Sequence, residues 1–308
     1  MSQPLAAVTG ATGFLGQHIV RAFAEAGWNV RILARRDPSS PFWTGLTPQV
    51  IAGSLNDDGA LARLCDGADV VVHAAGLIGG RAQDLEHVNV EGSRRVAAAV
   101  APAARFLQIS SLAAREPHLS SYAASKRAGE DAVRALLGDR AVIVRPPAVY
   151  GPGDRETLRL FALAASSPVL PVLDPSARMA LIHAQDAAAQ VVSIAQEGKM
   201  GSITLSDARP EGYGWRELMQ TASSALGRRP HLVHMPAAAL YAGVIIGGFG
   251  ARWRKRNSAI TLGKVRELTH VDWGVRPSEQ AVSAPAPQFD LLSGFLQTIA
   301  WYRTQDWL

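Results

Sequence analysis

The amino-acid sequence predicts an α/β fold with a doubly wound parallel sheet and a smaller C-terminal region on its substrate side. In the first half, short β-rich runs alternate with helical stretches. Several of these runs are continuously apolar, such as Val70–Val72 and Val142–Val144. Strands have this pattern when helices cover both faces of a parallel sheet. A glycine-rich turn directly after the first run supports the same fold class.

Strand and helix signals follow one another in a regular order over the first 150 residues. The expected strands are Leu5–Thr9, Asn29–Ala34, Val50–Ala52, Asp69–Ala74, Arg105–Ser110 and Ala141–Arg145. The expected helices lie at 14–26, 57–65, 84–101 and 121–137. Repeated βα units of this length predict a doubly wound sheet with right-handed crossovers.

The pattern loosens after about Gly151. The strand near Ile203 is expected to rejoin the main sheet. We therefore divide the chain into a main α/β domain, residues 1–150, and a smaller substrate-side region, residues 151–308. In the second region we expect helices near 155–165, 185–196 and 215–226, strands near 179–183, 202–205 and 231–235, and a last helix from about Asp290 to Tyr302.

Composition narrows the class of protein. The 308 residues are 48% hydrophobic and 19% charged, with a net charge of +5 and a pI near 9.7. A basic excess suits an anionic ligand, a membrane surface or nucleic acid, or it is simply a solvated face. No basic stripe is interleaved with aromatic residues, so we expect no nucleic-acid partner.

The cysteine and histidine content also bears on location and metal binding. Cys65 is the only cysteine, which excludes an intrachain disulfide and a cysteine metal cluster and fits a reducing cytoplasm. None of the eight histidines sits in a His-x-x-x-His or His-Glu pair, so no metal is expected. The N-terminus lacks the charged region and the cleavage site of a secretory signal, and a cytoplasmic location is expected.

The turn after the first strand reads Thr-Gly-Ala-Thr-Gly-Phe-Leu-Gly, from Thr9 to Gly16. Gly10 permits the tight turn, Gly13 lets backbone N–H groups approach a diphosphate, and Gly16 lets the helix pack close to the strand. The partial positive charge of the helix N-terminus then faces the diphosphate. This context predicts a Rossmann dinucleotide site. The residues expected to contact the dinucleotide here are Gly10, Thr12, Gly13, Phe14, Leu15 and Gly16.

The end of the second strand discriminates between the two nicotinamide dinucleotides. An NAD site usually places an acidic residue there for the ribose 2′-hydroxyl, whereas an NADP site places arginine for the extra phosphate. Arg35 occupies this position, with Arg36 next to it. We therefore expect NADP (NADPH) rather than NAD as the cofactor. The alternative is a pair of arginines on the surface with no ligand.

Further motifs make the chain resemble the extended short-chain dehydrogenase/reductases, in the broad epimerase/dehydratase group. Gly53-Ser54-Leu55 stands where the family has Gly-Asp-Leu, His73–Gly76 matches the fourth-strand motif, and Asn89 matches a helix asparagine. The loss of the acid weakens the adenine contact that the family makes. The resemblance implies that these segments contribute the cofactor contacts Ser54, Leu55, Ala74, Ala75 and Gly76.

The same resemblance supplies a catalytic group. Tyr122 and Lys126 match the Tyr-x-x-x-Lys motif, and a spacing of four places them on one helix face. Lys126 and the charged nicotinamide are expected to lower the pKa of Tyr122 and make it an acid/base catalyst, and Lys126 is also expected to hold the cofactor ribose. Ser111 aligns with the hydroxyl that polarises the carbonyl, and Ser110 is the second candidate.

Two later segments resemble family motifs that border the cofactor or support the structure and supply no catalytic group. Residues 145–152 resemble an Arg-Pro-x-x-x-Tyr-Gly-Pro segment whose backbone borders the nicotinamide, which implies cofactor contacts at Pro146 and Val149. Residues 181–186 resemble an Ile-His-Val-x-Asp motif. There His183 is expected to be structural, and Asp186 is expected to cap the next helix.

The interval between Ser111 and Tyr122 indicates the branch. It is about half that typical of nucleotide-sugar enzymes, and Pro147 replaces an asparagine that those enzymes often carry. The chain is closer to the branch of the NADPH-binding complex I subunit and to reductases of hydroxysteroid and lipid-like ketones. We predict hydride transfer to the carbonyl of an amphiphilic, lipid-like substrate. The alternatives are a nucleotide-sugar epimerase or dehydratase and a non-catalytic NADPH-binding scaffold.

Residues 237–256 combine an apolar run of about 14 residues with a basic end at Arg252–Arg256. The run is too short to span a bilayer, which takes about 20 residues. It suits peripheral contact at a membrane interface or a buried helix that covers the substrate cleft. A homodimer through the helices near 84–101 and 121–137 would be typical of the family.

Overall fold

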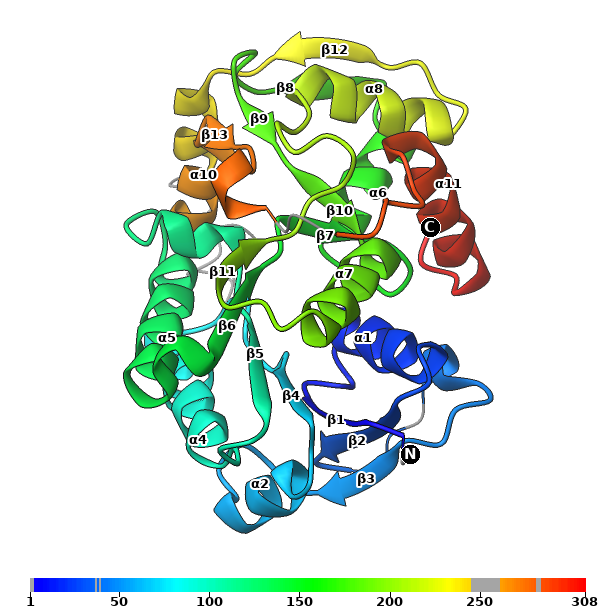
Figure 1. Cartoon of the computed structure of the whole chain (residues 1–308). Coiled ribbons are helices and arrows are strands. Elements are labelled where there is room, and N and C mark those ends of the chain that lie inside the picture. The colour runs from blue at the N-terminus through cyan, green and yellow to red at the C-terminus, as the bar shows by residue number, and fades with distance from the viewer. Residues whose placement is uncertain (1–2, 37, 39, 245–260, 281–283) are drawn as a thin grey trace.

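The computed structural model describes residues 3–36, 38, 40–244, 261–280 and 284–308. Its centre is a seven-stranded sheet in the order β11-β6-β5-β4-β1-β2-β3, in which every pair of neighbours is parallel (Figure 1). The predicted doubly wound sheet is confirmed. Its strands are β1 (Leu5–Thr9), β2 (Asn29–Ala34), β3 (Gln49–Ala52), β4 (Val70–His73), β5 (Arg105–Ile109), β6 (Ala141–Arg145) and β11 (Gly201–Thr204).

Helices cover both faces of the sheet because its strands are apolar on both sides. Along β1, Val8 faces the helices α1 (Phe14–Glu25) and α7 (Ala184–Gln196), whereas Ala7 faces the opposite layer. In β4, Val72 likewise faces α1 and α7, and Val71 faces the opposite layer. Burial of one such valine contributes about 1.5–3 kcal/mol. The opposite layer contains α2 (Asp58–Cys65), α4 (Gly92–Ala98) and α5 (Ser121–Leu137).

The helix expected over 84–101 is interrupted. It consists of α3 (Ala82–Leu85), a π-helical stretch η2 (Glu86–Glu91) and α4. The buried Asn89 lies in the π stretch, where its side chain bonds both backbone groups of Leu77. Single π turns are frequent at functional sites, because they re-aim one side chain without ending the helix.

The C-terminal part contains three two-stranded parallel sheets beside the main one. Their pairs are β7 (Ala148–Tyr150) with β10 (Leu181–His183), β8 (Val169–Val172) with β12 (His231–His234), and β9 (Arg178–Met179) with β13 (Asp272–Trp273). The one strand expected over 179–183 is thus two short strands, because its halves pair with different partners. The helices are α6 (Leu158–Ser166), α8 (Trp215–Ala225), α10 (Leu262–Thr269) and α11 (Leu291–Thr304), and residues 237–244 are also helical.

An aromatic core joins these C-terminal pieces. Phe295 of α11 packs edge-to-face against Tyr150 of β7 and Phe161 of α6, with ring centroids 5.1 and 5.0 Å apart. Such pairs contribute about 0.5–1.5 kcal/mol beyond their buried area. Gly294 is required beside Tyr150, since a Cβ there would lie 2.3 Å from the tyrosine hydroxyl. β11 meanwhile returns to the main sheet beside β6, as expected for the strand near Ile203.

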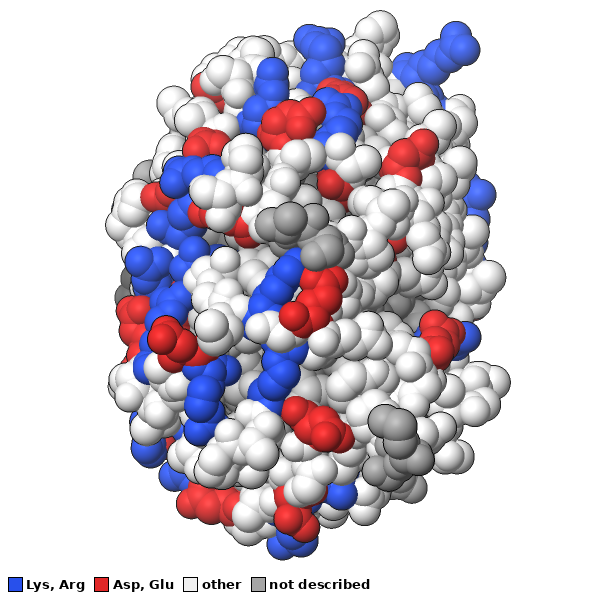
Figure 2. Space-filling model, in the orientation of Figure 1, with Lys and Arg blue, Asp and Glu red and all other residues white. Residues whose placement is uncertain are grey.

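The charged side chains of the surface are of both signs (Figure 2). Figure 2 shows Lys and Arg side chains interspersed with Asp and Glu mainly on the left and along the top of the visible face, whereas its right-hand part is largely uncharged. Among the described residues, no helix combines the length and apolar character needed to cross a bilayer.

Candidate active site

The turn between β1 and α1 packs as tightly as its glycines predicted. Gly10 has a φ of +70°, and a Cβ on it would lie 2.4 Å from the backbone nitrogen of Ala75. A Cβ on Gly16 would lie 2.0 Å from the Gly10 carbonyl oxygen. Gly13 begins α1 with no side-chain cap, and Thr12 beside it is exposed. The first N–H groups of α1 are thus available to an anion, as a dinucleotide diphosphate requires.

The ends of β2 and β3 lie next to this turn in the sheet. Arg35 and Arg36 follow β2 directly, are exposed, and make no ion pair or side-chain hydrogen bond with any described residue. After β3, the Ser54 hydroxyl accepts from the Asn56 N–H at 3.2 Å. Leu55 packs on α4, where a Cβ on Gly92 would lie 2.8 Å from it. Two free guanidinium groups therefore stand at the carboxyl edge of the sheet.

A buried polar network fixes the ends of β1 and β4. His73 bonds the Thr9 hydroxyl at 2.7 Å and the Ser93 hydroxyl at 3.1 Å. Burial, with a smaller contribution from the charge of Lys126, lowers the pKa of His73 to about 3, so this imidazole is neutral. The side chain of Gln108 on β5 donates to the same Ser93 hydroxyl at 3.1 Å. The network thus ties three strands to α4 beneath the site.

Asn89 fastens the segment after β4 to α5. Its carbonyl accepts from the Leu77 N–H at 2.8 Å, and its amide donates to the Leu77 carbonyl and the Ser125 hydroxyl, both at 2.9 Å. Ala74 and Ala75 are thereby held against Gly10. A Cβ on Gly76 would lie 3.2 Å from Asn89 Oδ1 and 3.5 Å from Lys126 Nζ, so this glycine packs closely against the asparagine and the lysine.

Ser111, Tyr122 and Lys126 converge where β5 ends and α5 begins. The Tyr122 hydroxyl hydrogen-bonds the Ser111 side chain, which also accepts from the Ala113 N–H at 3.2 Å. Lys126 lies one turn further along α5 and donates to the Ile109 carbonyl at 2.8 Å. The expected trio is therefore in one place, with the Ser111 hydroxyl beside the Tyr122 phenol.

Ser110 is occupied differently from Ser111. Its hydroxyl donates at 2.6 Å to Glu130, whose carboxylate is fully buried. Arg145 donates to the same carboxylate from Nε at 2.8 Å and from Nη2 at 2.5 Å. Sequence reasoning missed Glu130. The available signal was its position four residues after Lys126, on the helix face that already carries Tyr122 and Lys126.

The electrostatics of the trio differ from the sequence-based expectation. Burial raises the pKa of Tyr122; the Ser111 hydrogen bond opposes this and the Glu267 carboxylate adds to it. Burial lowers the pKa of Lys126 to about 8, with Glu130 opposing. The protein alone therefore does not lower the pKa of Tyr122. Desolvation has the larger effect on the pKa of Tyr122, and Lys126 directs its one assigned hydrogen bond to the Ile109 carbonyl rather than to the phenol.

Helix α10, from the C-terminal part of the chain, brings the side-chain carboxylate of Glu267 to this site, which the sequence did not predict. Gly263 packs directly on Ser120, since a Cβ there would lie 2.9 Å from the serine Cβ. Ser120 caps α5 and donates from its hydroxyl to Glu267. Trp273 Nε1 donates to the Glu267 carbonyl at 2.8 Å. The one sequence signal for α10 was Thr261, a helix-capping residue before Leu262.

Two later motifs border the site. Pro146 is buried, and its carbonyl accepts from the Leu112 N–H at 2.8 Å, so this segment runs beside Ser111. Val149 lies in β7 and is half-buried. The expectation that Asp186 caps α7 is wrong. Its carboxylate accepts from the N–H groups of Gln288 and Phe289 at 2.8 and 3.2 Å, while His183 provides the cap.

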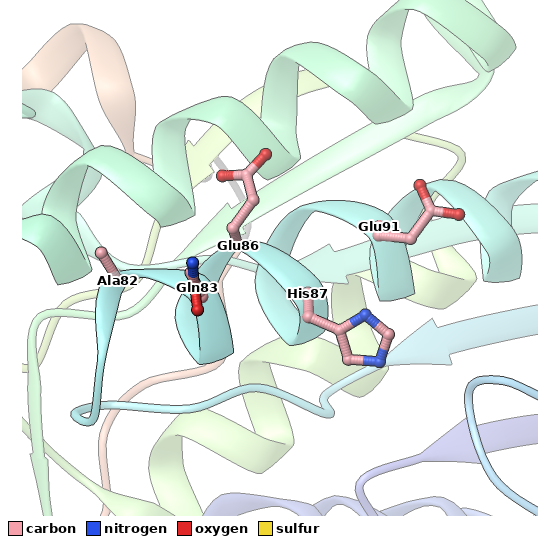
Figure 3. Close-up of a pocket in the computed structure, with 5 residues that line it drawn as sticks. All are labelled: Ala82, Gln83, Glu86, His87 and Glu91. Atoms are coloured by element: carbon pink, nitrogen blue, oxygen red, sulfur yellow. The ribbon is translucent and has the colours of Figure 1, made fainter.

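One hollow elsewhere on the surface has no part in this geometry. It measures about 610 Å³ and lies along α3 and η2, apart from the three converging residues. Figure 3 shows that Glu86 and His87 point to different sides of their helix. Among the residues that the structure describes, no group of three or more His, Cys, Asp or Glu is arranged to hold a metal. The hollow is lined by Ala82, Gln83, Glu86, His87 and Glu91.

A dinucleotide turn on β1 and polar residues at the carboxyl edge of a doubly wound sheet define the class: a dinucleotide-dependent α/β oxidoreductase. Within that class, residues 6–204 match the NAD dependent epimerase/dehydratase family. The chain belongs to this family, and it is an NAD(P)-dependent oxidoreductase of the extended short-chain dehydrogenase/reductase type. The family expected from the sequence is confirmed.

Individual relatives refine this placement. The chain is 50% identical to the ceramide reductase of Caulobacter vibrioides over 98% of this chain and 95% of that protein. It is 31% identical to the 4-hydroxy-2-methyl-3-oxo-4-farnesyl-3,4-dihydroquinoline-1-oxide ketoreductase of Stigmatella aurantiaca, over 48% of this chain and 51% of that protein. It is 24% identical to a mitochondrial NADH dehydrogenase [ubiquinone] 1 alpha subcomplex subunit 9 of Dictyostelium discoideum, over 70% and 62%.

Solved structures support the fold. The crystal structure of gox2253 superposes with a TM-score of 0.78 at 22% identity, over 100% of both chains. The Bordetella bronchiseptica enzyme WbmG in complex with NAD superposes with a TM-score of 0.73 at 20% identity, over 99% of this chain and 96% of that chain. At these identities the likeness concerns the fold alone.

Proposed function

We propose that this protein is an NADPH-dependent reductase of a lipid-like ketone, such as a 3-oxo lipid of the ceramide class. The observation that carries the proposal is the 50% identity to a ceramide reductase over nearly the whole of both chains. The convergence of Ser111, Tyr122 and Lys126 supports it, because these residues provide the groups that carbonyl reduction requires.

The proposed cofactor is NADP, held along the carboxyl edge of the sheet. The uncapped start of α1 suits the diphosphate, and the free Arg35 and Arg36 suit a 2′-phosphate, to which guanidinium groups bind with paired hydrogen bonds. The remaining contacts are assigned to the segments after β3, β4 and β6, which border the same edge. The proposed binding residues are Gly10, Thr12, Gly13, Phe14, Leu15, Gly16, Arg35, Arg36, Ser54, Leu55, Ala74, Ala75, Gly76, Tyr122, Lys126, Pro146 and Val149.

In the proposed mechanism, the Ser111 hydroxyl donates a hydrogen bond to the substrate carbonyl oxygen, and Tyr122 delivers the proton to that oxygen. Lys126 has three N–H groups and uses one on the Ile109 carbonyl, so two remain for the cofactor ribose. The nicotinamide, when bound, supplies the hydride and, once oxidised, a positive charge beside the phenol. That charge and the lysine would stabilise the phenolate that burial disfavours.

Residues 1–150 are assigned to cofactor binding and residues 151–308 to the substrate, with β11 as the part that returns to the sheet. The contact of α10 with Ser120 supports this division of labour, because it places the second region beside the reacting group. The proposal retains a cytoplasmic location with peripheral membrane contact, and a homodimer through α4 and α5. Of the segment 237–256 expected at the membrane, only 237–244 lies within the described residues, and there it is helical.

The proposal is tested by titrating NADPH and NADH and then assaying 3-oxo lipids beside nucleotide sugars. Reduction of the lipid ketone, with one NADPH consumed per product, is the expected result. Conversion of a nucleotide sugar with no net use of NADPH would assign the same trio to an epimerase instead. Normal cellular function of a Tyr122→Phe protein that binds NADPH would point to a scaffold.

A further inference from the structure

A basic hollow lies in the second region, at the far end of the molecule from α2 and α4 (Figure 1). Its volume is about 350 Å³. Three arginines and one histidine contribute to it, and the lining that the structure describes contains no carboxylate. The lining residues are Arg216, Gln220, Ser223, Ser224, Arg228, Arg229, Pro230, His231 and Leu232.

The backbone fixes this cluster in place. Arg216 and Gln220 are four residues apart on α8, so they lie on one face of the helix. The helix ends in a Schellman turn: the Arg228 N–H donates to the Ser223 carbonyl at 2.8 Å and the Gly227 N–H donates to the Ser224 carbonyl at 2.9 Å. Gly227 has a φ of +70°, which allows the chain to fold back. Arg228 and Arg229 are thereby brought beside Arg216.

The three guanidinium groups are exposed and uncompensated. None of Arg216, Arg228 and Arg229 makes an ion pair or side-chain hydrogen bond with another residue in the described part of the chain. A guanidinium binds a phosphate through two parallel hydrogen bonds, and a cluster of three favours a surface with many phosphates. Figure 2 shows Lys and Arg side chains projecting from the top of the molecule, where α8 and β12 lie.

Apolar side chains flank the cations. The parallel pairing of β12 with β8 sets His231 opposite Val169 and Val233 opposite Pro171. Val169 is 45% exposed and Val233 is 52% exposed, so both stand on the outer face of this two-stranded sheet. Cations next to exposed aliphatic groups suit the membrane–water interface. Binding to single-stranded nucleic acid would instead favour several aromatic stacking partners, and the lining has no Phe, Tyr or Trp.

We propose that Arg216, Arg228 and Arg229, with Val169 and Val233 beside them, form a docking surface for an anionic phospholipid bilayer. The surface belongs to the region assigned to the substrate, so it would bring a reductase of membrane lipids to its substrate. The proposal does not depend on that function, since bilayer binding is measured without catalysis.

The test is flotation of the full-length protein with vesicles of phosphatidylcholine alone or with about one-third phosphatidylglycerol. We expect binding to the anionic vesicles only, and weaker binding as salt is raised, since salt screens exposed charges. In the triple variant Arg216→Gln/Arg228→Gln/Arg229→Gln, the partition coefficient should fall about a hundredfold, or about fivefold for each arginine. The single variant Arg229→Gln gives the fivefold step if the triple variant folds poorly.

The matched control is Arg63→Gln/Arg81→Gln/Arg94→Gln, which removes the same charge from α2, from the residue before α3 and from α4, outside the proposed docking surface. It should bind like the wild type, and all proteins should keep their melting temperature and NADPH affinity. Equal binding to neutral vesicles, or an unchanged triple variant, would overturn the proposal. Displacement by inorganic phosphate beyond that caused by KCl of equal ionic strength would assign the cluster to a soluble phosphate ligand instead.

Discussion

The main sheet and the C-terminal part of this molecule position their residues in different ways. In the sheet, polar side chains stand at the ends of neighbouring parallel strands, and strand register alone brings Thr9 beside His73. In the C-terminal part, two-stranded pieces are joined by aromatic contacts such as Phe161 with Phe295. The comparison indicates that sheet geometry positions residues of the proposed cofactor-binding region, whereas side-chain packing positions those of the proposed substrate region.

The two parts meet beside the proposed acid/base residue. Arg115, just before α5, donates to the Gly274 carbonyl at 2.8 Å and lies 3.6 Å from the Glu279 carboxylate. Glu267 reaches Ser120 from the other side of the same junction. Changes in the sheet should therefore affect hydride transfer, and changes in the C-terminal part should affect stability or modulate the site through this junction.

The largest expected effect comes from comparing the same substitution, tyrosine to phenylalanine, in each of the two regions. Tyr122→Phe should lower kcat about 10²–10⁴-fold with little change in NADPH affinity, because it removes the proton donor. Tyr302→Phe removes a buried hydrogen bond to the Asp154 carbonyl, 2.7 Å long, and should cost about 1 kcal/mol of stability with kcat retained. Steady-state kinetics and urea unfolding distinguish the two. Equal losses of kcat in both variants would remove the proposed distinction.

Buried carboxylates should behave differently in the two regions. Glu130→Ala leaves Arg145 buried without its partner and should cost about 3–5 kcal/mol in the free energy of unfolding. Asp207 accepts from the Tyr213 hydroxyl at 2.6 Å, so Asp207→Ala should cost about 1–3 kcal/mol. Replacing Glu130 and Arg145 together by leucine should restore much of the loss. A double variant as unstable as Glu130→Ala would contradict the pair as the cause.

Arg35→Ser tests the cofactor preference, and its effect should be confined to the sheet region. The loss of a charge-assisted pair with the 2′-phosphate should weaken NADPH binding roughly 10–100-fold and leave NADH binding almost unchanged. Arg209→Ser in the C-terminal part removes an arginine paired with Glu217 and serves as the control. Fluorescence titration gives both dissociation constants. A wild-type protein that prefers NADH a hundredfold would refute the assignment of Arg35.

The smallest expected effect is that of Glu267, in the C-terminal part, on Tyr122 across the junction between the two parts. Glu267 raises the pKa of Tyr122 by its negative charge, so Glu267→Gln should lower that pKa. Alcohol oxidation requires the phenolate and rises with pH through this pKa, hence its rising limb should move to lower pH by under about one unit. Ser111, which also influences the pKa of the phenol, is unchanged in this variant. Glu211→Gln, on an exposed position, is the control, and an unmoved limb in Glu267→Gln would argue against electrostatic contact.

Sequence reasoning succeeded where structure is local and periodic. The seven strands of the sheet, the glycine turn and the helix that carries Tyr122 and Lys126 follow from apolar runs and fixed spacings. The grouping of these two with Ser111 followed from the resemblance to the family's serine and Tyr-x-x-x-Lys motifs, and in the structure they lie where β5 ends and α5 begins. Their catalytic roles remain predictions that the variants above will test.

The missed features depend on contacts between residues far apart in the chain. Helix α10 is placed by the close packing of Gly263 on Ser120, which no local pattern announces. Strands such as β9 and β13 have two residues each, too few for a periodic signal. Glu130 appears as an ordinary helix acid until Arg145 is seen to approach from β6. Burial also raises the pKa of Tyr122, an effect that the spacing could not predict, since spacing conveys proximity but not desolvation.

The central claim is that Tyr122 and Ser111 hold a lipid ketone for direct hydride transfer from the nicotinamide. Its most direct measurement uses NADPH with deuterium at the transferred position of C4 and a 3-oxo lipid of the ceramide class, followed by mass spectrometry of the product. We expect one deuterium on the new carbinol carbon with wild-type protein, and almost none with Tyr122→Phe in the same time. A reduced product without deuterium, or an unchanged rate in Tyr122→Phe, would contradict the account.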